Sequence, residues 1–491
     1  MRKALLLLAA LPTLALAQNT RTPLAAQAPA VDRQVERLRD AALRDDVAYD
    51  IMEGLTTEIG PRQAGTEAEA RARAWAVRKL RELGFRNVRV EEFRMPTWVR
   101  GAETAEVVSP FPQKLHVTAL GQSASTGPNG ITAEVVGFEN VDALRRAPAG
   151  SLRGKIAFVS HNMTRTQDGS QYSSAGPARW NAPQIAKDKG AVGIVIRSVG
   201  TDYHRNPHTG GTNWVAPGQG PAGNARSSVQ VDPSTLPAIP AGALSLPDAE
   251  NLGRMLSRAP RGRPVTMKLT LTPRWIGQQT SGNVVAEVPG TDPDAGVVLI
   301  GGHLDSWDLA TGAFDNAAGV AITAAAAKRV MDAGRPRRTI RVVWFGAEEV
   351  GVFGGAEYHR RHNADAGRER VVLVSESDFG ADRVWRLDLK LPPENKALGD
   401  RVAAALAPLG VARGGDAAGA GADLGAWARG GVAAVDLQQD GTRYFDLHHT
   451  PDDTLDKVDR DQVRQNVAAW TAMLSVVANA PEEIGRVGSG Q

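Results

Sequence analysis

The fold is decided by the stretch Val297–Trp307, which reads VVLIGGHLDSW. Its first four residues form a continuous apolar run, which is typical of a strand that is buried on both faces of a sheet. Two glycines and then His303, Leu304 and Asp305 follow this run directly. In open α/β sheets, ligands bind at the edge where the strands end. The stretch therefore predicts an α/β fold with polar, functional side chains at that edge.

Three further apolar runs lead to polar residues in the same way, and they are Ile340–Phe345, Val371–Val374 and Val432–Leu437. The residues that follow the three runs are Glu348 and Glu349, then Glu376 and Asp378, and then, after a loop, His448 and His449. Helix-length segments separate the runs, among them the Ala-rich stretch Ala317–Ala333, and the amphipathic stretch Asp459–Asn479 follows the last run. This order predicts a three-layer α/β/α domain around a mixed, mostly parallel sheet.

The chain of 491 residues is longer than one hydrophobic core usually supports. Residues 112–272 are rich in Gly, Pro, Ser and Asn, and only short apolar runs such as Ile156–Val159 and Val192–Ile196 interrupt them. We expect a smaller, β-rich inserted domain there. The main domain would then consist of residues 18–111, which include a helical stretch at Val31–Leu55 and a helix at Thr66–Leu83, and of residues 273–480, with a tail at 481–491.

The first 17 residues predict a signal peptide. Arg2 and Lys3 precede the apolar run Ala4–Leu16, and Ala15-Leu16-Ala17 forms a small-residue cleavage site before Gln18. The run is too short to span about 30 Å of hydrocarbon comfortably. We therefore expect an exported protein, periplasmic or secreted, without a membrane anchor after cleavage.

Composition excludes several classes of function. The chain contains no cysteine, which rules out thiolate metal sites, cysteine nucleophiles and disulfides. Its formal net charge of +3 is spread thinly, without a long basic run, so nucleic acid is not an expected partner. No Gly-x-Ser-x-Gly nucleophile elbow occurs, which argues against a serine hydrolase. Any metal must bind to His, Asp and Glu; such ligands suit Zn²⁺, and a shared carboxylate can bridge two ions.

Five short motifs together resemble those of the zinc peptidases of family M28. They are His303-Leu304-Asp305, Phe314-Asp315-Asn316, Ala347-Glu348-Glu349, Glu376-Ser377-Asp378 and His448-His449-Thr450. Within this family, Gly301–Trp307 and Glu376–Asp378 are most similar to the carboxypeptidase Q (plasma glutamate carboxypeptidase) type. The resemblance covers Gly277 to about Asn479. Residues 112–272 resemble the protease-associated domain that is inserted into some of these enzymes.

The resemblance implies two Zn²⁺ per chain and a role for each residue of the motifs. The implied metal ligands are His303, Asp315, Glu349, Asp378 and His449. Asp315 would bridge the ions, with His303 and Asp378 at one of them and Glu349 and His449 at the other. Glu348 would be the general base, and the Asp305 carboxylate would accept the second ring N–H of His303. The implied substrates are dipeptides or short peptides with a free amino terminus, and a homodimer is possible.

Several alternatives stay open from the sequence. The same fold is used by receptor-like proteins that only bind, and by glutaminyl cyclase-type acyltransferases with one zinc. Aminopeptidase, strict dipeptidase and carboxypeptidase activities are not distinguished. Asn316 departs from the acidic residue that many members carry there, but its side chain can still cap the following helix. His448 is either a neighbour of the substrate or a packing residue.

Other polar residues have weaker claims to the site. His204 and His208 occupy a Gly/Asn-rich loop of the predicted inserted domain and are expected on its surface. Asp423 and Trp427 resemble a family segment that lines the pocket, although packing in the core explains Trp427 equally well.

Overall fold

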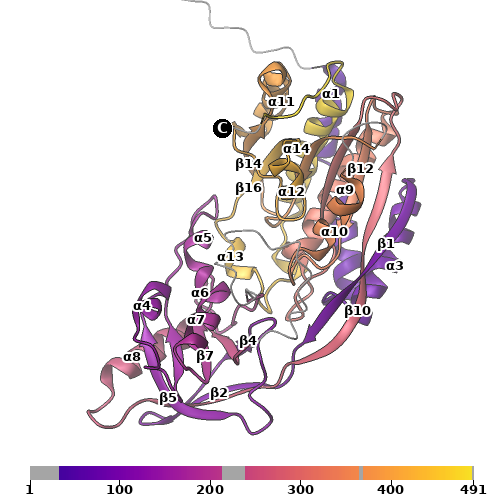
Figure 1. Ribbon diagram of the computed structural model, residues 1–491. Helices are drawn as coiled ribbons and strands as arrows, with labels where there is room; N and C mark the ends of the chain where they lie inside the picture. Colours follow the sequence, from indigo (N-terminus) through magenta and orange to yellow (C-terminus); the bar gives the residue numbers. More distant parts are fainter. Residues whose placement is uncertain (1–31, 213–237, 364–368, 489–491) are drawn as a thin grey trace, which may run out of the picture.

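The computed structural model describes residues 32–212, 238–363 and 369–488 (Figure 1). It contains two eight-stranded sheets, each of which carries helices. The predicted signal peptide, residues 1–17, lies outside the described residues. Among the helices of the three described ranges, none is long and apolar enough to cross a membrane.

The first sheet is mixed, which confirms the α/β class. Its strands in spatial order are β1 (Arg86–Val99), β10 (Arg274–Val288), β12 (Thr339–Phe345), β11 (Val297–His303), β13 (Val371–Glu376), β16 (Ala433–Gln439), β14 (Val384–Lys390) and β15 (Ala412–Arg413). The central strands β12, β11, β13 and β16 are parallel to one another. β10 pairs antiparallel with β12 on one side, and β14 pairs antiparallel with β16 on the other. The four apolar runs of the sequence are therefore the four parallel strands.

Alternate residues of the central strands point into two different cores. In β11, Val298 and Ile300 belong to one buried cluster, whereas Val297 and Leu299 belong to the other. This period of two follows from strand geometry, and it explains why the run is apolar without interruption.

Helices cover both faces of this sheet. The first face packs against α1 (Arg33–Ala42), α2 (Val47–Gly54), α3 (Glu67–Glu82), α9 (Ala318–Asp332), α11 (Lys396–Leu406) and α14 (Arg460–Asn479). The second face packs against α10 (Phe353–His362) and α12 (Gly425–Arg429). Thr66 and Asp459 cap α3 and α14 with their side chains, at the positions expected from the sequence.

The stretch Val31–Leu55, which reads as one helical segment, is divided in the structure. The chain leaves α1 after Ala42 and starts α2 at Val47. The Asp45 carboxylate accepts the Val47 N–H at 2.8 Å and so satisfies a donor at the start of the new helix. A π-helical turn, Leu55–Ile59, follows α2.

The second sheet is formed entirely between β1 and β10 in the sequence. Its strands in spatial order are β3 (Gln113–Leu115), β2 (Glu103–Ser109), β9 (Thr266–Leu271), β5 (Ile131–Phe138), β6 (Ile156–Val159), β7 (Gly193–Arg197), β8 (Ala241–Leu244) and β4 (Val117–Ala119). Its helices are α4 (Val141–Arg146), α5 (Gln171–Ala175), α6 (Pro177–Trp180), α7 (Ala182–Asp188) and α8 (Leu246–Arg258). We call residues 103–271 the inserted unit. The long β1–β10 ribbon connects it with the first sheet (Figure 1).

Candidate metal centre

The candidate residues lie where the parallel strands end. His303 is the last residue of β11, Glu348 and Glu349 lie just beyond β12, and Asp378 lies just beyond β13. Asp315 lies in the segment Ala313–Ala317 that precedes α9, and its own backbone is not helical, with φ −123° and ψ 88°. His449 follows the short helix α13 (Tyr444–Leu447), which lies between the two sheets in Figure 1. Because the parallel strands end at the same edge of the sheet, residues from distant parts of the chain lie at one place.

Asp315 stands at the centre of these side chains. Its Oδ1 lies 3.0 Å from His303 Nε2, and its Oδ2 lies 3.2 Å from His449 Nε2. Asp378 Oδ1 is 3.2 Å from the same nitrogen of His303, and Glu349 Oε2 is 3.0 Å from the same nitrogen of His449. We call His303, Asp315 and Asp378 cluster A, and Asp315, Glu349 and His449 cluster B. The two clusters share one carboxylate.

Burial and the close approach of carboxylates and imidazoles shift the pKa values of the side chains in both clusters. Burial, together with the charge of Asp315, raises the pKa of Glu349 to about 8, and burial raises the pKa of Asp378 to about 6. Burial opposes the protonation of His449, but the Glu349 and Asp315 carboxylates outweigh it and raise the pKa of His449 to about 9. Glu349 Oε1 is buried and has no hydrogen-bond partner among the described residues. Buried imidazole nitrogens and carboxylate oxygens, one of them without a hydrogen-bond partner, are suitable ligands for a metal cation such as Zn²⁺.

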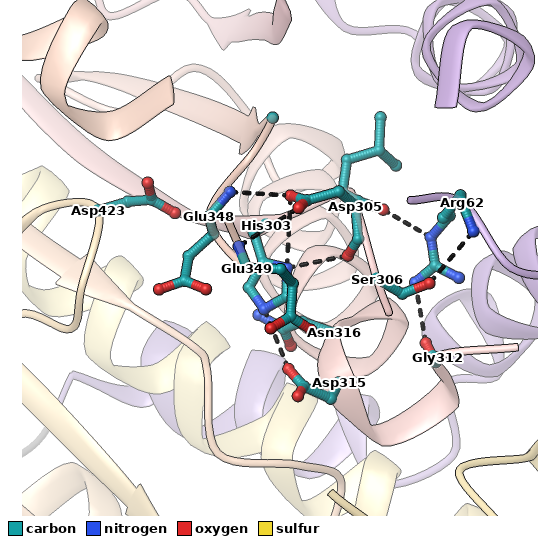
Figure 2. Close-up of polar contacts among 12 residues, drawn as sticks. Arg62, His303, Asp305, Ser306, Gly312, Asp315, Asn316, Glu348, Glu349 and Asp423 are labelled. Atoms are coloured by element: carbon teal, nitrogen blue, oxygen red, sulfur yellow. Dashed lines mark hydrogen bonds and ion pairs between the residues drawn. The ribbon is translucent and has the colours of Figure 1, made fainter. Parts of the chain in front are cut away.

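Asp305 is fully buried and contacts the site through two different groups. Its backbone carbonyl lies 2.9 Å from His303 Nδ1, whereas its carboxylate Oδ1 is 3.7 Å from that nitrogen. The carboxylate instead accepts the N–H of Glu348 at 3.1 Å and the N–H of Glu349 at 3.3 Å (Figure 2). The orientation of His303 is thus set by the carbonyl, and the carboxylate fixes the turn that carries both glutamates.

His448 also faces the Asp315 carboxylate. Its ring stacks on that of His449 with centroids 3.5 Å apart, and its Nε2 lies 3.7 Å from Asp315 Oδ2. Burial lowers the pKa of His448 well below its usual range, and the nearby His449 adds to this. A neutral imidazole at this position can take part in binding a cation together with Asp315 and His449.

Four further residues singled out in the sequence lie around the clusters or in the core beside them, and they are Asn316, Glu376, Asp423 and Trp427. The side-chain oxygen Oδ1 of Asn316 accepts the Gly319 N–H at 2.8 Å, so this side chain caps the start of α9 as predicted. Glu376 accepts the Asp423 N–H at 2.9 Å, and burial raises the pKa of both carboxyl groups well above their usual range. Trp427 packs in the core on the second face of the sheet.

The surface position predicted for His208 is wrong. Its side chain is buried, and its Nδ1 lies 2.8 Å from the His448 carbonyl oxygen. The loop of the inserted unit that carries His208 packs against the turn that carries the two site histidines. This contact joins residues 240 positions apart, so local composition could not indicate it.

Asp453 and Arg62 also support the site through hydrogen bonds to its backbone, and a sequence motif could have indicated Asp453. The Asp453 carboxylate accepts the N–H of Phe314 at 2.6 Å and the N–H of Asp315 at 3.1 Å, and burial raises its pKa to about 7. It belongs to the same His-Thr-x-x-Asp-Thr spacing as His449. Arg62 had no such signal, because it follows an ordinary Gly-Pro pair.

Arg62 binds the backbone of the loop that connects the His303-Leu304-Asp305 motif with the Phe314-Asp315-Asn316 motif. Its guanidinium donates to the carbonyl oxygens of Leu304 at 2.5 Å, Thr311 at 2.5 Å and Gly312 at 2.8 Å (Figure 2). Burial lowers its pKa to about 10. The guanidinium is fully buried and lies close to the carboxylates of Asp305, Asp315, Glu349 and Asp453.

We expect Arg62→Met to lower the free energy of unfolding by about 3 kcal/mol, since three buried carbonyl groups lose a charged donor. Urea unfolding of the metal-free protein would measure this loss. Arg145→Met is the matched control, because Arg145 forms an exposed ion pair on α4, and its loss should change stability by less than about 0.5 kcal/mol. Equal losses in both variants would contradict the role of Arg62.

Comparison with known proteins shows which family this chain resembles. The family model described as Peptidase family M28 matches residues 283–474. Carboxypeptidase Q of Mus musculus is 33% identical over 440 residues, which are 89% of this chain and 87% of that protein. A crystal structure of a Peptidase M28 precursor from Shewanella amazonensis SB2B is 41% identical with a TM-score of 0.85, covering 92% of this chain and 98% of that one.

The fold is also shared with a zinc aminopeptidase from Bacillus subtilis. That structure is 20% identical, with a TM-score of 0.60, and the match covers 89% of this chain and 97% of that one. The five implied metal ligands, together with Glu348 and Asp305, lie inside the family match at 283–474.

Proposed function

Since this chain belongs to peptidase family M28, we propose that it is a zinc-dependent exopeptidase that hydrolyses dipeptides or short peptides with a free amino terminus. One observation carries the proposal: the two oxygens of Asp315 face two different imidazoles, at 3.0 and 3.2 Å. A carboxylate placed in this way is suited to bridge two ions about 3.5–4 Å apart. Zinc suits the donors, because they are His, Asp and Glu in a chain without cysteine.

In this proposal cluster A would hold one Zn²⁺ and cluster B the other. Bound zinc would polarise the scissile carbonyl and make the attacking water more acidic. Glu348 takes a proton from that water and returns it to the leaving amine. Asp305 supports this step, since its carboxylate holds the backbone of Glu348 and Glu349 in place. Asp453 holds the backbone of Asp315 in the same way.

We infer action on chain ends from the relatives. A small cavity lies beside the clusters, and Trp307, Leu309, Glu349 and His449 are among the residues that line it. Glu348 and Glu349 are less than one-tenth exposed. The match to a carboxypeptidase and the shared fold of an aminopeptidase agree with this, but they do not choose between the two ends.

Three further predictions from the sequence belong to this proposal. The inserted unit would be a protease-associated-like domain, and its position between β1 and β10 fits an insertion. Export rests on the N-terminal pattern of residues 1–17. A homodimer would be detected by sedimentation at micromolar concentration.

The test combines metal analysis with a panel of substrates. We expect two zinc ions per purified chain, and rapid hydrolysis of free dipeptides with slow hydrolysis of the same peptides after N-acetylation. Equal rates for free and acetylated peptides would contradict the free amino terminus. One zinc per chain with a cyclised product would indicate the acyltransferase, and a protein without metal or turnover would indicate a binding protein.

A further inference from the structure

A loop of the inserted unit contacts the turn that presents His449. The Thr209 N–H donates to the His449 carbonyl at 3.0 Å, and His208 Nδ1 lies 2.8 Å from the His448 carbonyl oxygen. His449 has a φ of +62°, a left-handed conformation that is uncommon for a residue with a side chain. Such a conformation persists only where the surroundings hold it. Here, the loop at 208–209 provides part of those surroundings.

The same loop faces the ring nitrogen that points away from the clusters. The Thr209 carbonyl oxygen lies 3.2 Å from His449 Nδ1. When Nε2 binds a metal, Nδ1 of the neutral ring carries the proton and needs an acceptor, which fixes the orientation of the ring. Arg179 of α6, which is buried, donates from Nη1 to the Thr209 carbonyl oxygen at 3.4 Å, and the same nitrogen lies 3.2 Å from His449 Nδ1. Because a guanidinium can only donate, Arg179 binds the Thr209 carbonyl alone when His449 Nδ1 carries the proton, and it thereby holds the acceptor in place.

The inserted unit also contacts the turn after Glu349. Gln122 Nε2 donates to the Val350 carbonyl at 2.8 Å, directly beyond Glu349 in the chain. Both residues that distinguish cluster B from cluster A, Glu349 and His449, are therefore next to backbone that the inserted unit holds.

Cluster A is supported in a different way. His303 Nδ1 faces the Asp305 carbonyl, which belongs to the same strand end. Beside Asp378, the Ser377 N–H donates to the Gly301 carbonyl of β11, and the Ser377 carbonyl accepts from Asn316 at 2.8 Å. These contacts come from the first sheet and from the start of α9.

We propose that the inserted unit positions one metal ion of the two: Arg179 and the segment 208–210 are positioning residues for His449, so that tight binding at cluster B depends on them and binding at cluster A does not. The proposal rests on the proposed two-zinc function. It gives the inserted unit a role in building the metal centre.

Gly210→Ala tests this directly. Gly210 has a φ of +131°, and a Cβ atom there would lie 2.4 Å from Arg179 Nη1 and 2.7 Å from His449 Nδ1, so the segment, the Arg179 side chain or the His449 ring must shift, and each of these shifts disturbs the contacts that position His449. Gly150→Ala is the matched control, because Gly150 lies in the same unit at a φ of +73° and a Cβ atom there meets nothing within 4 Å. Competition with a zinc chelator would measure the affinity for each ion without an activity assay.

Two background variants assign the effect to one ion. His303→Ala leaves only cluster B intact, and Glu349→Ala leaves only cluster A intact. We expect Gly210→Ala to weaken zinc binding about 10- to 100-fold in the first background and to leave it unchanged in the second, which is the size of effect typical for partners of metal ligands. Gly150→Ala should change neither.

The possible failures are distinguishable. Equal weakening in both backgrounds, or no weakening in either, would overturn the role of the inserted unit while two zinc ions in the wild type kept the proposed function. A wild type without zinc would overturn the proposed function itself. If circular dichroism shows that Gly210→Ala does not fold, Arg179→Met takes its place, with Arg197→Met as control because Arg197 is a buried cation of the same unit that pairs with Glu250.

Discussion

Glutamine in place of Glu348 is expected to lower kcat for dipeptide hydrolysis by about 10²–10⁴-fold while both zinc ions stay bound. The amide keeps the size of the side chain but can no longer accept a proton from the attacking water. Elemental analysis and steady-state kinetics on the same sample would measure the two effects together.

The structure explains why Glu348 and not Glu349 should behave in this way. The backbone N–H groups of both residues bind to Asp305, and the carboxylate of Glu349 lies against His449, at 3.0 Å. The charge of Glu348 acts on a different group of acids, since it contributes to raising the pKa of Asp423 and of Asp378. Figure 2 shows Glu348 on the side of Asp423. Its position is suited to proton transfer next to the clusters.

Glu349→Gln is the matched control, because it makes the same chemical change one residue further along. It should reduce the zinc content from two ions to one, in contrast to Glu348→Gln. If Glu348→Gln lost zinc and Glu349→Gln kept both ions, the roles of the two glutamates would have to be exchanged.

Much of the first sheet could be predicted from the sequence. Strands that are buried on both faces need continuous apolar runs, and four such runs with polar residues beyond them marked the parallel strands β11, β12, β13 and β16. Because the candidates follow strand ends, the pattern indicated that His303, the Glu348-Glu349 pair and Asp378 would lie at one edge of the sheet. The resemblance to the family then selected the five ligands from all the candidates.

The supporting contacts could not be predicted, because they depend on packing between distant segments. Arg62 binds carbonyl groups about 240 to 250 positions away, and Thr209 contacts a histidine 240 positions away. Local patterns also did not show which group of Asp305 would face His303. That choice depends on the turn after β12, whose N–H groups take the Asp305 carboxylate.

Alanine in place of Asp315 should remove both zinc ions, whereas Asp378→Ala and Glu349→Ala should each remove one. The reason is that Asp315 offers one oxygen to each cluster, so its loss leaves each cluster with two of its three ligands. The Phe314 and Asp315 N–H groups that bind to Asp453 belong to the backbone and remain in the variant, so we expect a folded chain.

Elemental analysis would count the ions in the three variants, and thermal unfolding with and without a chelator would provide a second measure. A ligand at 100 times its Kd stabilises a folded protein by about 2.7 kcal/mol per site, so wild type should lose Tm on chelation and Asp315→Ala should not. One retained zinc in Asp315→Ala would mean that the carboxylate does not bridge. In that case, His448 would be the next residue to substitute with alanine. Its Nε2 lies 3.7 Å from Asp315 Oδ2, so it could serve as the third ligand of cluster B in place of Asp315.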